Sequence, residues 1–133
     1  MLEWSDELSC HVDKIDLQHK SLVNMVNVLH DSMRDGAADT VLFGIVEDMR
    51  VYTVEHFGTE EQYMAEFAYP DIEAHKVEHK DFVDKVCAVE GDLKSGKVAL
   101  SMDILNFLSN WLVTHIVDTD KKMGDFLASK GAV

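Results

Sequence analysis

The chain has 133 residues, of which 12 are Lys or Arg and 25 are Asp or Glu, so its formal charge is -13 with neutral histidines. An apolar fraction of 47% is enough for one folded domain with its own core, and a charged fraction of 28% is not typical of a disordered chain. The acidic balance excludes nucleic acids and anionic membrane surfaces as expected partners, because binding to either requires clustered Lys and Arg.

The two cysteines, Cys10 and Cys87, are far apart and form no Cys-x-x-Cys pair, so neither a zinc ribbon nor a thioredoxin-type redox pair is expected. We interpret both as free thiols in a reducing compartment, which predicts a cytoplasmic protein. The N-terminal residues are acidic, and the longest apolar run, residues 41–46, is too short to span a bilayer. We therefore expect no signal peptide and no membrane contact.

Apolar residues recur at helical spacing in the first half of the chain. Residues 15–35 follow this pattern up to Asp35-Gly36, a glycine signal for a helix end. Residues 40–67 form the longest predicted helix, which ends before Tyr69-Pro70 because the residue preceding proline is pushed out of helical geometry. The inward positions predicted for this helix are 42, 45, 49, 52, 56, 60, 63 and 67.

The second half contains two further helical patterns, residues 71–94 and residues 101–118, and the inward positions of the latter are 104, 108, 111 and 115. The apolar phase then shifts, which predicts a short terminal helix at about 120–128. Four amphipathic helices with short connections predict an all-α, up-down-up-down antiparallel four-helix bundle. We expect residues 1–133 to form this single domain, with an N-terminal arm carrying Trp4 and Leu8 over one end.

Each predicted apolar stripe is interrupted by residues that normally stay on the surface. These residues are His19, His56, Glu60, His75, His79 and His115. Burying an imidazole or carboxylate without a partner costs several kcal/mol, about as much as the whole stability of a small domain. The groups therefore need a shared partner, and a metal can provide it.

The spacing of these residues supports metal binding. His56 and Glu60, like His75 and His79, are four residues apart, so each pair projects side by side from a helix. His115 and Asp120 are five apart, which leaves them about 140° out of alignment in a regular helix. We therefore predict a π-type wide turn over residues 116–120.

Five imidazoles and two carboxylates are too many for one ion and suit a dinuclear site with bridging carboxylates. Nitrogen and oxygen ligands without thiolate favour iron, manganese or zinc, and ligand chemistry does not choose among the three.

Four segments carry a longer pattern: Ile15-Asp16-Leu17-Gln18-His19 with Leu22; His56-Phe57-Gly58-Thr59-Glu60-Glu61; His75-x-x-x-His79; and Trp111-Leu112-x-x-His115-Ile116-x-x-x-Asp120. Together they resemble the hemerythrin family, specifically its bacterial members. The resemblance spans nearly the whole chain, and every ligand position of the family pattern is present in order.

The resemblance implies a non-haem di-iron site that binds O2 reversibly. One iron would be held by His75, His79 and His115, and the other, which keeps an open position, by His19 and His56. Glu60 and Asp120 would bridge the two irons together with an oxo or hydroxo group. The O2 side would be walled by Leu22, Phe57, Trp111, Leu112 and Ile116, for which plain core packing is the alternative role.

The leading functional hypothesis is a carrier, store or scavenger of O2 that is not an enzyme and that delivers O2 to an acceptor oxygenase or oxidase. One alternative is an O2 or redox sensor domain excised from a larger signalling protein, which requires an attached output domain. Another is a di-iron peroxide or redox enzyme, which requires a proton donor that the predicted pocket wall lacks. Three acidic residues near the ligands, Glu61, Glu78 and Asp118, are interpreted as solvated, and Asp16 as a helix-start cap.

Overall fold

The structure is a computed structural model that describes residues 3–96 and 102–131. Within these ranges all regular secondary structure is helical. The elements in chain order are the 3-10 turn η1 (Asp6–Leu8), α1 (Asp13–Arg34), α2 (Asp39–Glu66), α3 (Ile72–Lys94), α4 (Met102–Thr114), the π-helix η2 (His115–Asp120) and α5 (Lys121–Ser129).

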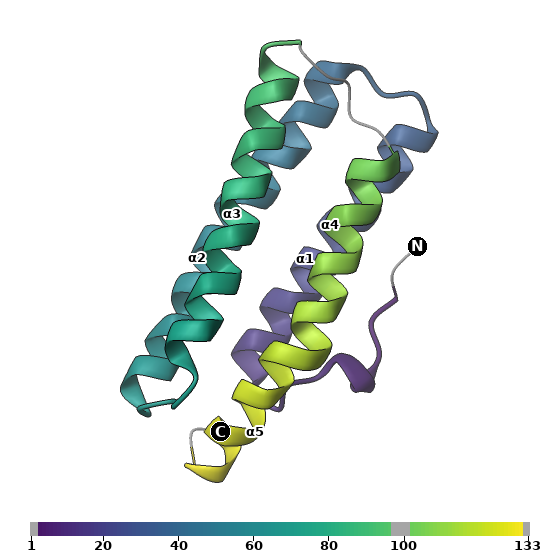
Figure 1. The fold of residues 1–133 in the computed structure, drawn as a ribbon. Helices are drawn as coiled ribbons and strands as arrows, with labels where there is room; N and C mark the ends of the chain where they lie inside the picture. The colour runs from purple at the N-terminus through teal and green to yellow at the C-terminus, as the bar shows by residue number, and fades with distance from the viewer. Residues whose placement is uncertain (1–2, 97–101, 132–133) are drawn as a thin grey trace.

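Successive long helices run in opposite directions, and α2 packs against both α1 and α3 (Figure 1). This confirms the predicted up-down-up-down antiparallel four-helix bundle. The predicted start of the fourth helix at Ser101 lies outside the described residues. Its predicted end at residue 118 differs from the structure, in which α4 ends at Thr114 and the chain continues through η2 into α5.

Two predicted helix ends, at Gly36 and before Pro70, are present in the structure. Gly36 adopts a φ of 75°, a left-handed conformation that glycine accepts without steric cost, and its N–H donates to the carbonyl of Met33. At the other end of the bundle α2 ends at Glu66, and the Tyr69 N–H donates to the carbonyl of Met64 just before Pro70. These turns keep the connections short and the helices adjacent.

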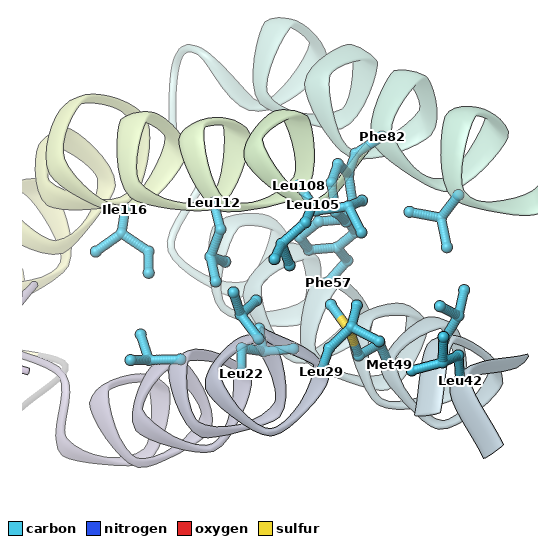
Figure 2. Packing of buried hydrophobic residues seen from close by; sticks show 14 residues of the cluster. Leu22, Leu29, Leu42, Met49, Phe57, Phe82, Leu105, Leu108, Leu112 and Ile116 are labelled. Atoms are coloured by element: carbon cyan, nitrogen blue, oxygen red, sulfur yellow. The ribbon is translucent and has the colours of Figure 1, made fainter. Parts of the chain in front are cut away.

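The core consists of two apolar clusters. The larger one draws residues from all four long helices, including Leu22 of α1, Phe57 of α2 and Leu112 of α4 (Figure 2). The smaller one surrounds α5 and includes Ile15 and Met64. Between them lies a polar layer, because on each helix a buried His or carboxylate separates the residues of the two clusters. This layer holds the candidate site.

The N-terminal arm packs along the outside of the bundle rather than across its end (Figure 1). Trp4 and Leu8 contact the larger cluster. Ser9 Oγ and the Cys10 N–H donate hydrogen bonds to the two carboxylate oxygens of Asp16, at 2.5 and 2.9 Å. Asp16 therefore holds the arm and does not cap α1, contrary to the prediction. None of the described helices combines the length and apolarity that crossing a membrane would require.

Candidate metal centre

The structure brings all seven predicted ligand residues into one buried layer. His19 comes from α1, His56 and Glu60 from α2, His75 and His79 from α3, and His115 and Asp120 from η2. Each of them is at most 2% exposed. Buried charge at this density requires compensation within the layer itself, because water is not available to solvate it.

The donor atoms fall into two sets that share two carboxylates. One set consists of Glu60, His75, His79, His115 and Asp120, and the other of His19, His56, Glu60 and Asp120. Within each set one ligand atom per residue lies within 4.8 Å of every other. Glu60 and Asp120 therefore stand between the two groups of imidazoles.

Each shared carboxylate turns one oxygen to each group. Glu60 Oε1 lies 2.9 Å from His79 Nε2 and 3.3 Å from His75 Nε2, whereas Oε2 lies 3.1 Å from His56 Nε2. Glu60 Oε2 is also 3.3 Å from His19 Nε2. Asp120 divides in the same way, with Oδ2 2.8 Å from His19 Nε2 and Oδ1 3.0 Å from His75 Nε2. This is the arrangement that a bridging carboxylate requires.

Local helix geometry positions these side chains. The two pairs spaced by four residues lie on single faces of α2 and α3, as predicted. The predicted wide turn is present as the π-helix η2, and it brings Asp120 Oδ1 to 3.0 Å from His115 Nε2. In an α-helix these two residues would point in directions about 140° apart, so the wide turn is what admits Asp120 to the layer.

The chemistry of the donors fits a pair of divalent cations. The Nε2 atoms of His79 and His115 lie 3.1 Å apart and both face Glu60 Oε1. The Nε2 atom of His56 is also buried and lies 3.1 Å from Glu60 Oε2. Inward-facing nitrogens and carboxylates of this kind need protons or cations between them. Imidazole and carboxylate ligands without thiolate suit iron, manganese or zinc.

Without a metal, protons take that place. Burial by itself would lower the pKa of His19 and of His75, but hydrogen bonds to Asp120 and Glu60 outweigh burial and raise both pKa values to about 9. Burial would raise the pKa of Glu60, yet the charge of His56 and hydrogen bonds from the imidazoles hold that pKa well below its usual range. The metal-free layer therefore carries imidazolium and carboxylate at neutral pH.

The outer nitrogens of three imidazoles have partners that the sequence interpretation missed. His56 Nδ1 donates to Gln18 Oε1 at 2.6 Å, and His79 Nδ1 donates to Glu61 Oε2 at 2.9 Å. His115 Nδ1 donates to Glu78 Oε1 at 3.2 Å. Glu61 and Glu78 are thus not simply solvated, although their side chains remain 33% and 45% exposed.

The positions of these partners in the sequence could have indicated their role. Gln18, Glu61 and Glu78 each stand next to a predicted ligand in sequence, and each supports an imidazole on the following long helix or its continuation. A residue adjacent to an inward one lies about 100° around the helix, on the flank that meets a neighbouring helix. Asp118, by contrast, lines a surface cavity of about 360 Å³ together with His75 and Glu78.

The five residues predicted to wall an O2 site lie around the same layer. Leu22, Leu112 and Ile116 are buried in the larger cluster and face the space between α1 and α4 (Figure 2). Phe57 stacks on His79 with ring centroids 3.8 Å apart. Trp111, half-buried, stacks on His115 at 4.5 Å. Apolar and aromatic groups therefore enclose the imidazoles.

Comparisons with known proteins identify the family. Residues 10–127 match the family model described as the Hemerythrin HHE cation binding domain. The chain is 34% identical over 128 residues to the bacteriohemerythrin of Stenotrophomonas maltophilia, covering 94% of this chain and 80% of that protein. It is 32% identical over 133 residues to the bacteriohemerythrin of Methylococcus capsulatus, covering 97% and 98%.

A solved structure of wild-type hemerythrin superposes with a TM-score of 0.91 at 32% identity, over 96% of this chain and 98% of that one. The matched segment includes every residue of the buried layer. The chain belongs to the hemerythrin family.

Proposed function

We propose that this protein binds O2 reversibly at a non-haem di-iron centre and acts as a carrier, store or scavenger of O2. The observation that carries the proposal is the division of oxygens, in which Glu60 and Asp120 each turn one oxygen to His19 and the other to His75. Two irons bound in this layer would supply the two electrons that O2 accepts when it binds. The match to a cation binding domain supports a bound metal, and imidazole and carboxylate donors without thiolate suit iron.

The side chains have distinct roles in this proposal. His75, His79 and His115 would hold one metal and His19 and His56 the other, with Glu60 and Asp120 as ligands available to both. Because the set of His19 and His56 offers one imidazole fewer, O2 is expected on that side of the layer. Leu22, Phe57, Trp111, Leu112 and Ile116 exclude water from that side, which withholds the protons that would release reduced oxygen as peroxide.

The proposal is tested by metal content and reversible colour on one sample. Protein reduced under anaerobic conditions is analysed for iron, and its optical spectrum is recorded before O2, after O2 and after removal of O2. Two irons per chain and an absorption band that appears and then reverses are expected. Irreversible oxidation would instead favour a redox sensor or enzyme, and fewer than two irons would contradict the di-iron centre.

The buried side chains next to η2 are expected to control autoxidation. Replacing Leu112 or Ile116 with Ala opens space beside His115 and should speed autoxidation severalfold, because water reaches the reduced centre. Leu105→Ala is the matched control, since Leu105 is a buried leucine of α4 about 10 Å further along the helix. Equal autoxidation rates in the Leu112→Ala and Leu105→Ala variants would show that Leu112 has only a packing role.

Metal loading is expected to strengthen as the pH rises from about 6 to 9. The metal-free pKa values of His19 and His75 lie at about 9, so both imidazoles are protonated at pH 7 and must lose their protons to bind a metal. Calorimetric titration with Zn2+ at pH 7, in two buffers of different ionisation enthalpy, measures the protons released. Binding at pH 7 with no proton release would contradict this charge state.

A further inference from the structure

The partners of the outer imidazole nitrogens differ between the two sets of ligands. In the set of His75, His79 and His115, two rings donate to carboxylates, those of Glu61 and Glu78. In the set of His19 and His56, one ring donates to the neutral amide of Gln18. The Nδ1 atoms of His19 and His75 have no hydrogen-bond partner among the described residues. The hydrogen-bonded outer partners are thus two carboxylates in one set and one neutral amide in the other. The carboxylate of Asp16 lies within 4.8 Å of a ring nitrogen of His19, but the Asp16 oxygens accept their hydrogen bonds from Ser9 and Cys10.

Two of the three partners, Gln18 and Glu78, are each held in place by a further hydrogen bond. Glu78 accepts a second hydrogen bond from Thr119 Oγ1 at 2.9 Å, which comes from η2 itself. The Gln18 amide nitrogen donates to Thr59 Oγ1 at 3.2 Å, so its oxygen is turned toward His56. Glu61 lines a cavity of about 570 Å³ between α2 and α3, together with Phe57 and His79. The difference between the sets is therefore part of the packed structure.

A carboxylate that accepts the outer N–H of a metal-bound imidazole makes the ring a stronger donor, and it does so through its negative charge. An amide oxygen in the same place fixes the ring orientation and tautomer but adds no charge. Both kinds of partner aim Nε2 at the metal, so geometry is conserved across the layer while donor strength is not.

We infer that Glu61 and Glu78 make the position served by His75, His79 and His115 the tighter of two metal positions, and that Gln18 leaves the position of His19 and His56 weaker and more exchangeable. These three residues are positioning residues, since they act through the imidazoles. The inference rests on the proposed two-metal centre and adds an order of filling, in which the first metal enters the three-histidine position.

Stepwise titration of the metal-free full chain with Co2+ tests this order without iron or O2. Glu61→Gln and Glu78→Gln keep an acceptor of the same size and remove its charge, and each should weaken the first equivalent about 10-fold to 100-fold while the second changes little. Gln18→Glu adds the missing charge and should tighten the second equivalent. Glu73→Gln, which removes an exposed charge from α3, the helix of Glu78, is the control for general electrostatics.

Proton NMR identifies which position is filled. At one equivalent of Co2+, hyperfine-shifted Nδ1–H signals of His79 and His115 are expected, one moved by Glu61→Gln and the other by Glu78→Gln, with neither moved by Gln18→Glu. Circular dichroism shows which variants are folded. If Gln18→Glu does not fold, the Glu61→Gln and Glu78→Gln variants still test the inference.

Two results would overturn the order of filling alone, provided that the wild-type chain binds two Co2+. In the first, Glu61→Gln and Glu78→Gln weaken the affinity for both equivalents equally. In the second, they weaken the affinity for the first equivalent no more than Glu73→Gln does. Fewer than two bound Co2+ per wild-type chain would overturn the two-metal centre and the order of filling with it.

Discussion

Replacement of Glu60 is expected to abolish binding of the second metal. Glu60 is fully buried, and its two oxygens lie within 3.6 Å of an Nε2 atom from every one of the five buried imidazoles. Glu60→Ala removes both oxygens, and Glu60→Gln leaves one oxygen and places an N–H against ring nitrogens. In either variant the metal content should fall from two per chain to one or fewer.

The same change should destabilise the metal-free protein. Its imidazolium groups lose a buried counter-charge, and breaking such a buried pair costs about 3 to 5 kcal/mol of unfolding free energy. Elemental analysis after dialysis gives the metal content, and urea titration gives the stability. Glu55→Gln is the matched control, because Glu55 is exposed on the same helix α2. Retention of two tightly bound metals by Glu60→Gln would refute the bridging role.

Gly124→Ala is expected to detach the N-terminal arm. A Cβ atom on Gly124 would lie 1.8 Å from the backbone oxygen of Cys10, a contact that only movement of backbone can relieve. We expect the free energy of unfolding to fall by about 1 to 3 kcal/mol. Gly91→Ala is the control: Gly91 is an exposed position within α3 with nothing within 4 Å of its added Cβ, and its replacement should stabilise the helix by about 0.5 to 1 kcal/mol.

The two cysteines report arm detachment directly. Cys87 is exposed, whereas Cys10 is buried, and burial raises the pKa of the Cys10 thiol far above its usual value. A thiol reagent should therefore modify one cysteine rapidly in the wild-type protein and two in Gly124→Ala. Rapid modification of a single thiol in a Gly124→Ala protein of unchanged stability would show that the arm tolerates the added methyl group. Detachment also uncovers His19, which lies close to Cys10.

The sequence was sufficient for the fold class and for the wide turn in η2. The turn could be predicted because His115 and Asp120 have to share a face and cannot do so in an α-helix. The prediction of which residues point inward was less accurate for α2 and α4. Thr53 and Leu105 are buried where Tyr52 and Ile104 were predicted. A large side chain at the edge of a stripe can cover the core while half-buried, so apolarity alone does not fix which neighbour points inward.

The residues that accept hydrogen bonds from the outer imidazole nitrogens could not be distinguished from solvated surface residues in the sequence. Glu61 and Glu78 have the composition of a solvated helix face, and only the distance to a neighbouring helix distinguishes them from Glu73. The contact between Gly124 and Cys10 joins opposite ends of the chain. No local pattern encodes it, because helical periodicity constrains each segment separately.

The π-helix η2 also fixes the register between the two ends of the chain. Gly124 follows Asp120 by four residues and shares its face of the continuing helix, so the turn that admits the carboxylate also presents the glycine to Cys10. A regular α-helical path through the same six residues, His115–Asp120, would rotate Asp120 and everything beyond it by about 100°. Such a change removes no ligand, yet it should cost both the bridge and the docking of the arm. The backbone conformation of this segment is therefore as constrained as the identity of the ligands.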